Sequence, residues 1–238
     1  MGDTSRRRAP RAGGMKIAAL SEPGTERRTQ LTRQRVVAAA IELADRDGIE
    51  ALSMRRLAQE LGVEAMSLYT HVRNKDDLLD GMVDAVISEI PITADGVDWK
   101  TSLRQTVLAA RSVVLRHVWA PRTMETRTTS GPAVPRYFDA VIGILREGGL
   151  SIALAHHALH ILGSRVLGFT QDLFDDSEDL EPEAAAKLAS ELGATHPYVA
   201  EMAVAVTHEG ALGGCDDDAE FEFALDFILD GLDRLQGD

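Results

Sequence analysis

The amino-acid sequence predicts an all-α protein with two helical domains, and three observations carry this prediction. Apolar residues recur at the helical spacing i, i+3, i+4, i+7 over much of the chain after residue 31. Ser or Thr residues precede several of these stretches and glycines follow them, as at the two ends of a helix. We find no pair of alternating apolar stretches joined by a tight turn, which would indicate a β-hairpin. A length of 238 residues suffices for one large or two small domains.

The composition is that of a globular protein, with 45% hydrophobic and 26% charged residues. No apolar run approaches the roughly 20 residues that a membrane span needs. Arginines near the N-terminus are not followed by an apolar run, so we expect no secretory signal. The single cysteine, Cys215, excludes an intramolecular disulfide and a cysteine-based zinc site. We therefore expect a cytoplasmic protein without a membrane partner.

The charge of the chain is distributed unevenly. Residues 1–90 carry 14 basic and 14 acidic residues, whereas residues 91–238 carry 11 basic and 24 acidic residues, so the net charge of −13 lies in the second part. Residues 1–35 alone have nine basic and three acidic residues. Such a chain can bind a polyanion through its N-terminal part while the acidic part faces away. Acidity that serves only solubility is an equally good interpretation.

The chain divides into three segments. We expect residues 1–30, rich in Arg, Gly, Pro, Ser and Thr, to be a disordered basic arm. Residues 31–90 are predicted to hold a helix capped by Thr32 and ended by Gly48, a helix at 54–61 capped by Ser53, and helices at about 65–71 and 75–90. Residues 91–238 are predicted to form a second helical domain.

The second domain follows a linker at 91–98 that contains Pro91 and Gly96. We predict helices at 99–119 and 134–147, and a long helix capped by Ser151 that reaches about Phe174. Further helices are expected at about 183–192, 197–207 and 219–235. Loops are expected at 120–132 and, in an acidic stretch, at 175–183.

The stretch LGVEAMSLYTHVRNKDDLL, residues 61–79, holds the first sign of function. Two helices joined by a tight turn at Gly62 and Val63 form a helix-turn-helix, whose second helix enters the DNA major groove. Leu68 and Val72, at i and i+4, would hold that helix against the core. Polar residues on its other side suit contacts with base edges and phosphates. The residues expected to bind DNA are Ser53, Arg55, Ala65, Met66, Ser67, Tyr69, Thr70, His71 and Lys75.

The segment LTRQRVVAAAIELADRDGIEALSMRRLAQELGVEAMSLYTHVRNKDDLLDGM resembles the N-terminal DNA-binding domain of the TetR (tetracycline-repressor-like) family of bacterial transcription regulators. The resemblance implies a homodimer with a helix-turn-helix near the N-terminus. It also implies a larger helical domain that dimerises through a four-helix bundle and encloses a small-molecule pocket. Ala65, Met66 and Thr70 differ from the residues of tetracycline repressors, which leaves the operator sequence open.

The second domain resembles the regulatory domain of tetracycline repressors more weakly, in GVDWKTSLRQ, GILREGGLSIALAHHALHILGSRVLGFTQD and FEFALDFILDGLDRL. The resemblance implies a homodimer formed by the helices at 151–174 and 219–235. Pro91 stands where those repressors place a ligand-anchoring histidine just after the fourth helix. Asp172 falls near their acidic metal-ligand position.

An apolar stripe on the predicted helix 99–119 suggests a ligand cavity. Together with large side chains that follow this helix, the residues of the stripe could line such a cavity, although ordinary core packing explains each residue as well. His117, near the end of that helix, either complements the helix dipole or contacts a ligand. The expected ligand-binding residues are Leu103, Val107, Ala110, Val114, His117, Trp119, Met124, Phe138, Val141 and Asp172.

Other candidate chemistry is weaker. His156 and His160 have the i, i+4 spacing of a metal pair, but on a helix of the dimer bundle we expect them to pack or to form hydrogen bonds. Cys215 precedes three aspartates, which disfavour a reactive thiolate. We find no nucleophile, phosphate-loop or paired-carboxylate motif of an enzyme. The sequence therefore predicts no enzyme, no metal and no cofactor.

The resulting hypothesis is a ligand-responsive transcriptional regulator, most simply a repressor. A homodimer would bind a pseudo-palindromic double-stranded operator, and a small-molecule effector would release it. One alternative is a helical small-molecule- or metal-binding protein with weak or lost DNA binding. Another is a regulator without a ligand, controlled by its abundance.

Overall fold

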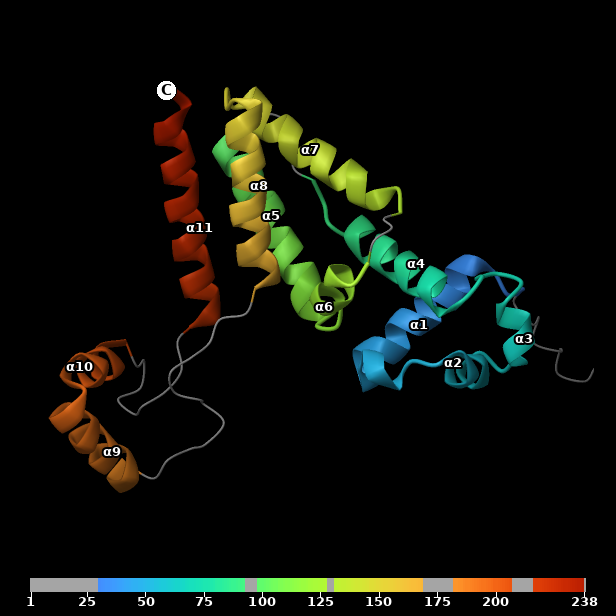
Figure 1. Cartoon of the computed structure of the whole chain (residues 1–238), viewed down its shortest axis with the longest axis horizontal. Helices are drawn as coiled ribbons and strands as arrows, with labels where there is room; N and C mark the ends of the chain where they lie inside the picture. The colour runs from blue at the N-terminus through green and yellow to red at the C-terminus, as the bar shows by residue number, and fades with distance from the viewer. Residues whose placement is uncertain (1–29, 93–97, 128–130, 169–181, 207–215, 238) are drawn as a thin grey trace, which may run out of the picture. The chain divides into compact units, whose positions relative to one another are not determined.

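A computed structural model describes residues 30–92, 98–127, 131–168, 182–206 and 216–237 (Figure 1). Within these ranges the chain forms α-helices and short 3-10 turns and no β-strand, so the all-α prediction is confirmed. No helix in these ranges is long and apolar enough to cross a membrane. The expected basic arm lies outside the described residues, apart from residue 30.

The N-terminal helices begin where the sequence predicts them: α1 (Arg33–Asp47), the 3-10 turn η1 (Ile49–Ala51), α2 (Met54–Glu60), α3 (Ala65–Leu68) and α4 (Lys75–Ser88). The predicted caps are confirmed, because Thr32 Oγ1 accepts a hydrogen bond from Arg35 N and Ser53 Oγ accepts one from Arg56 N. Helix α1 packs on α2 and α4, and α2 packs on α3. The side chains that hold these helices together are fully or almost fully buried: Val36, Ala40, Leu43, Leu57, Leu68, Val72, Leu78 and Met82.

The third helix is shorter than predicted. The α-helix ends at Leu68, and the backbone then turns with hydrogen bonds from His71 N and Val72 N to Leu68 O. The hydroxyl of Thr70 donates to Ser67 O, and Arg33 Nη1 donates to His71 O. In a longer α-helix His71 N would bond Ser67 O, but here Ser67 O accepts from the Thr70 hydroxyl and His71 N bonds Leu68 O. The expected helical residues 69–71 therefore form a turn.

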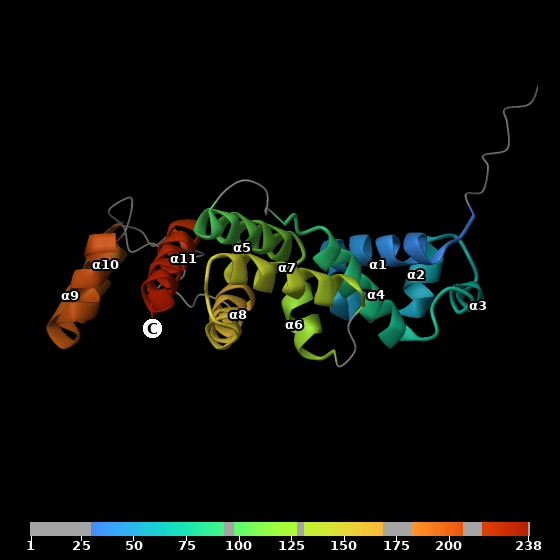
Figure 2. The ribbon, with the colours of Figure 1, turned by 90° about the horizontal axis from the view of Figure 1, so that it is seen from above.

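The second half contains α5 (Trp99–Arg116), α6 (Ala120–Glu125), α7 (Ala133–Glu147), α8 (Ile152–Leu167), α9 (Pro182–Thr195), α10 (Pro197–Val206), α11 (Asp217–Arg234) and the 3-10 turn η2 (Leu235–Gly237). Helix α5 packs on α7, α8 and α11, and α8 lies beside α11 (Figures 1 and 2). Helices α9 and α10 pack on each other. Phe221, Leu225 and Leu229 of α11 join Leu145 and Leu150 in the buried core of this half.

Three predicted boundaries in this half are wrong. Residues 120–125, expected as part of a loop, form α6, because Pro121 lies in the first turn, where its missing N–H is not needed. Helix α5 ends at Arg116, because His117 leaves the helical conformation with φ −118° and ψ 65°. Helix α8 ends at Leu167 because Gly168 is extended, and the rest of the expected helix lies outside the described residues.

The packing of α7 on α5 generates a prediction on stability. A Cβ added at Gly148, the C-cap of α7, would collide with the ring of Trp99, whereas a Cβ at Gly143 within α7 meets no atom within 4 Å. We expect Gly148→Ala to lower the free energy of unfolding by about 1–3 kcal/mol, and Gly143→Ala to raise it by about 0.5–1 kcal/mol. Urea unfolding followed by circular dichroism measures both, and equal effects of the two substitutions would contradict this packing.

Candidate nucleic-acid interface and ligand cavity

The turn between α2 and α3 requires a glycine. Gly62 has a φ of +65°, which L side chains rarely adopt. The N–H of Val63 then donates to Ala58 O at 3.0 Å and closes the end of α2. This geometry sets α3 against α2 as a helix-turn-helix, with Leu68 and Val72 buried as predicted.

The opposite side of α3 and the turn after it is open to solvent. Met66 is 72% exposed and Tyr69 is 44% exposed, although large apolar and aromatic side chains are usually covered. Arg55, Thr70 and Lys75 are also exposed. Ala65, Ser67 and His71 are half-buried at the edges of this face. We call these eight residues the recognition face; it contains all the predicted DNA-binding residues except Ser53.

The free cations of this face have the chemistry that phosphates need. Neither Arg55 nor Lys75 forms an ion pair with another residue in the described part of the chain. Arg73, which the sequence analysis left out, has an 84% exposed side chain and forms a contact of 3.3 Å with Asp77. Ser53, by contrast, uses its hydroxyl oxygen to cap α2.

A carboxylate fastens the recognition face to two helices. Asp77 of α4 accepts hydrogen bonds at 2.9 and 3.1 Å from the guanidinium of Arg33 in α1. It also accepts one at 2.8 Å from the backbone N–H of Arg73. The hydrogen bonds from Arg33 are the largest effect on Asp77 and hold the pKa of its carboxyl well below the usual value, against burial, which raises it. Arg33 therefore joins α1, α4 and the turn at His71.

Three further aspartates of α4 form hydrogen bonds with Arg127, which follows α6, and with Ala133, which begins α7. Asp76 and Asp80 accept hydrogen bonds from Arg127, at 3.0 Å to Nη1 and 2.8 Å to Nε respectively. Asp84, one turn further, accepts a hydrogen bond of 2.6 Å from the backbone N–H of Ala133 at the start of α7. A Cβ on Gly131 would collide with this carboxylate. The spacing i, i+4, i+8 thus places all three carboxylates on one face of α4.

Helix α1 has its own contact with the second half of the chain. Asp45 accepts hydrogen bonds from Trp119 Nε1 at 2.6 Å and pairs with His117 Nδ1 at 2.8 Å. Both partners are more than 90% buried. Trp119, expected to contact a ligand, and His117, expected either to contact a ligand or to complement the helix dipole, connect α5 and α6 to α1. The pairing of His117 with an aspartate 72 residues away in sequence could not be read from its helix.

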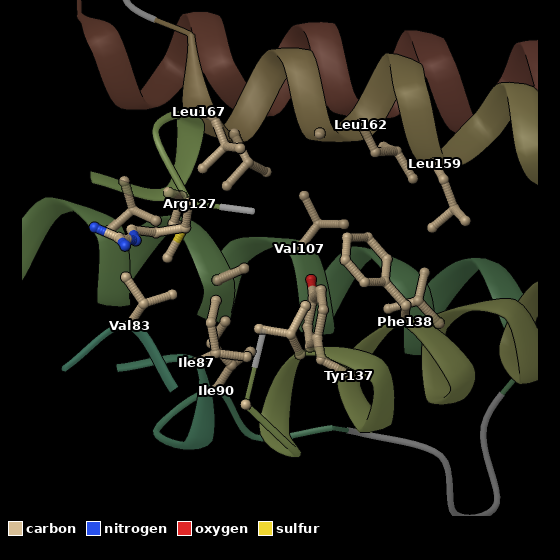
Figure 3. A pocket seen from close by; sticks show the side chains of 18 of the residues that line it. Val83, Ile87, Ile90, Val107, Arg127, Tyr137, Phe138, Leu159, Leu162 and Leu167 are labelled. Carbon is tan, nitrogen blue, oxygen red and sulfur yellow. The ribbon is translucent and has the colours of Figure 1, made fainter. Parts of the chain in front are cut away.

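An apolar cavity of about 400 Å³ lies between α4, α5, α7 and α8 (Figure 3). This volume is within the range of small-molecule sites. Its wall is apolar apart from Asp80, Arg127 and the hydroxyl of Tyr137. The lining residues are Asp80, Val83, Ile87, Ile90, Val107, Ala110, Val114, Met124, Arg127, Gly131, Val134, Tyr137, Phe138, Val141, Leu159, Leu162, Gly163, Val166 and Leu167.

The structure divides the residues expected to bind a ligand. Six of them lie in the cavity wall: Val107, Ala110, Val114, Met124, Phe138 and Val141. Leu103 is fully buried and packs in the core with α11 instead. Asp172 lies outside the described residues.

The polar residues of the cavity are not among the residues predicted from the sequence to bind a ligand. Tyr137 precedes Val141 by four residues, and this helical spacing was the available signal. Arg127 stood in a stretch read as a loop, and Asp80 stood on a helix assigned to the DNA-binding domain. No local pattern connects these two residues, which are 47 positions apart.

The suggested histidine metal pair has an incomplete set of ligands. The rings of His156 and His160 lie 4.6 Å apart between centroids. Among the described residues no group of three or more His, Cys, Asp or Glu side chains is placed to hold a metal ion. The residues present thus give no support to a metal-binding role.

Comparisons with known proteins match both halves of the chain. The family model "Bacterial regulatory proteins, tetR family" matches residues 36–82. The model "Tetracyclin repressor-like, C-terminal domain" matches residues 91–235, more than half of the chain. The chain belongs to the TetR family. Both parts of the resemblance seen in the sequence are thereby confirmed.

Named relatives of this TetR-family chain are transcriptional regulators. An HTH-type transcriptional regulator of Saccharopolyspora erythraea is 36% identical over 153 residues, which span 63% of this chain and 65% of that protein. The HTH-type transcriptional repressor DrrR1 of Streptomyces coeruleorubidus is 31% identical over 216 residues, 86% of this chain and 78% of DrrR1. The crystal structure of apo ActR from Streptomyces coelicolor has a TM-score of 0.68 at 29% identity and covers 87% of this chain and 97% of ActR.

The contact between Arg33 and Asp77 predicts a pH-dependent stability. A lowered pKa contributes stability above the ordinary aspartate pKa of about 4, and that contribution is lost as the pH falls below it. We expect Asp77→Asn to lower the free energy of unfolding by about 1–3 kcal/mol at pH near 7. The difference from wild type should shrink toward a pH of about 3.

Urea unfolding at the two pH values measures this effect. The control is Glu50→Gln, at an exposed position of η1, which should change the stability little at either pH. A difference for Asp77→Asn that is the same at both pH values would contradict an ionised Asp77 as the stabilising group.

Proposed function

We propose that this TetR-family protein is a ligand-responsive transcriptional repressor. A homodimer binds a pseudo-palindromic operator through two recognition faces, and a small molecule in the apolar cavity releases it. The observation that carries this proposal is that α4 contacts both the recognition face and the cavity. The same helix holds the recognition face through Asp77 and lines the cavity through Asp80, Val83 and Ile87. Such a protein acts where the DNA is, in the bacterial cytoplasm, and needs no catalytic step.

The recognition face supports specific DNA binding. Met66 and Thr70 project from the helix-turn-helix, where side chains reach base edges in the major groove. Arg55, Arg73 and Lys75 surround them with positive charge, which suits the DNA backbone. The named relatives point the same way, since DrrR1 is a transcriptional repressor.

Helices α8 and α11 support a homodimer. They carry large exposed apolar side chains, which a monomer in water rarely leaves uncovered in such number. On α11, Phe223 is 71% and Phe227 is 67% exposed, and on α8 Ile152 is 64% and Ile161 is 48% exposed. Two copies of this helix pair would form a four-helix bundle. Such a dimer presents two recognition faces to successive turns of the operator.

The cavity supports control by a small molecule. The solved structures similar to this chain include ActR in complex with actinorhodin, at 28% identity and a TM-score of 0.66. In this chain a ligand would touch α4 and the Arg127–Asp80 pair. It would shift the conformational equilibrium by the difference between its affinities for the DNA-binding and the released states.

The recognition face is tested by operator binding. An operator is first selected from genomic DNA fragments with the purified chain, and affinities are then measured by gel shift. We expect Tyr69→Ala and Lys75→Ala each to weaken operator binding by about tenfold, because each removes a backbone or base contact. Lys75→Ala should also lower the slope of log affinity against log salt by about one.

The matched control is Lys187→Ala, which removes an exposed lysine of α9 and should leave operator affinity unchanged. Circular dichroism verifies that the variants are folded. If folded Tyr69→Ala and Lys75→Ala bind the operator as tightly as wild type, the recognition face is wrongly placed.

The contact between α4 and Arg127 is tested by a double-mutant cycle. Arg127→Gln, Asp80→Asn and their combination are compared by the free energy of operator binding. Because both residues belong to one hydrogen-bonded pair that positions α4, we expect a coupling energy of about 0.5–3 kcal/mol.

A second ion pair serves as the control. Lys100 and Asp230, 2.6 Å apart, join α5 to α11. The cycle of Lys100→Gln and Asp230→Asn should show no coupling in operator binding. If the effects of Arg127→Gln and Asp80→Asn on operator binding are additive, the ion pair between these residues does not contribute to DNA binding.

A further inference from the structure

The hydroxyl of Tyr137 is a polar group inside an otherwise apolar part of the cavity. Tyr137 lies on α7, and its oxygen points toward Val107, beside the ring of Phe138 (Figure 3). It forms no hydrogen bond with any of the described residues. The hydroxyl thus faces the cavity with its hydrogen-bonding capacity unused by the described residues, so it is positioned to bind a ligand.

The protonation state of Tyr137 makes it a hydrogen-bond donor. Burial raises the pKa of its phenol to about 12, because the charged phenolate is disfavoured away from water. The hydroxyl therefore keeps its proton at neutral pH. A protonated phenol can both donate and accept, and its O–H can donate to a carbonyl or ether oxygen carried by the ligand.

The charged residues of the cavity wall are already used. Asp80 and Arg127 pair with each other at 2.8 Å, and Arg127 also pairs with Asp76 at 3.0 Å. An anion near Arg127 would be repelled by these two carboxylates, and a cation near Asp80 would be repelled by Arg127. A charged ligand therefore gains little from this pair, whereas an uncharged ligand leaves it intact.

Aromatic side chains and a missing side chain shape the remaining space. The rings of Tyr137 and Phe138 meet edge to face, with centroids 5.9 Å apart, and both line the cavity. Such rings pack well against the ring system of a ligand. Gly163 of α8 also lines the cavity, and a Cβ there would meet no atom within 4 Å. A cavity volume of about 400 Å³ is within the range that holds a small fused-ring molecule.

We propose that the cavity binds an uncharged, ring-containing ligand whose acceptor oxygen is held by the hydroxyl of Tyr137. Tyr137 is then the residue that selects the ligand, while Asp80, Val83 and Ile87 of α4 sense its presence. This inference rests on the proposed function for its regulatory meaning. Its binding chemistry stands on the cavity alone.

The test uses two fluorescent probes that differ in a single group. Prodan is an uncharged naphthyl ketone, and dimethylaminonaphthalene has the same ring system without the ketone. Both are titrated against the full-length chain. We expect wild type to bind Prodan about tenfold more tightly than the ketone-free probe, since one added hydrogen bond changes affinity by roughly this factor.

Two variants separate the hydroxyl from the cavity. Tyr137→Phe removes only the hydroxyl, so Prodan binding should weaken about tenfold while binding of the ketone-free probe changes less than about twofold. Gly163→Leu fills the cavity and should weaken both probes by more than about tenfold. Circular dichroism verifies the fold of each variant; a leucine in place of a helical glycine favours the helix.

Three results would overturn the proposal. One is Prodan binding to Tyr137→Phe as tightly as to wild type while Gly163→Leu abolishes it. Another is tighter binding of the anionic probe anilinonaphthalene sulfonate than of Prodan, with Arg127→Gln rather than Tyr137→Phe weakening it. A third is the absence of binding of either uncharged probe to wild type.

Operator binding by wild type, measured in the gel shift above, separates this inference from the proposed function. If wild type binds no operator but holds Prodan through Tyr137, the proposed function fails and the ligand chemistry stands. If wild type binds the operator and Tyr137→Phe leaves Prodan binding unchanged, the regulator stands and this ligand assignment fails.

Discussion

The paired hydrogen bonds from Arg33 to Asp77 hold the recognition face in place. The guanidinium bonds both carboxylate oxygens of Asp77 and also the backbone oxygens of Asp77 and His71. A planar guanidinium matches such a set of acceptors better than an ammonium group does. The four-residue α3 is too short to be stable alone. Its orientation therefore depends on this contact and on the buried side chains of Leu68 and Val72.

Helix α4 connects the recognition face to the cavity because its polar residues lie on different faces. Asp77 faces α1, whereas Asp76, Asp80 and Asp84 face Arg127 and the start of α7. Its apolar residues Val83 and Ile87 line the cavity. A change in the cavity thus acts on the same rigid element that positions Tyr69 and Lys75.

Local structure followed from the sequence because its causes are local. The caps at Thr32, Ser53 and Ser151 satisfy backbone N–H groups three residues away, so a short stretch suffices to predict them. The helix-turn-helix was equally legible, since Gly62 and the spacing of Leu68 and Val72 define it. The wrong predictions of helix boundaries also have local causes. For example, Pro121 lies in the first turn of α6, in a stretch that was expected to be a loop.

The sequence by itself predicted the all-α fold, the helix-turn-helix and the family. The tertiary structure decided the cavity and its polar groups. Leu103 and Val107 share one apolar stripe on α5 and both belong to the buried core, yet only Val107 also lines the cavity. Periodicity shows which face of a helix is covered, but a cavity is a gap left among several helices. For the same reason the partners of Arg127, His117 and Trp119, all from distant parts of the chain, emerged only when the helices packed.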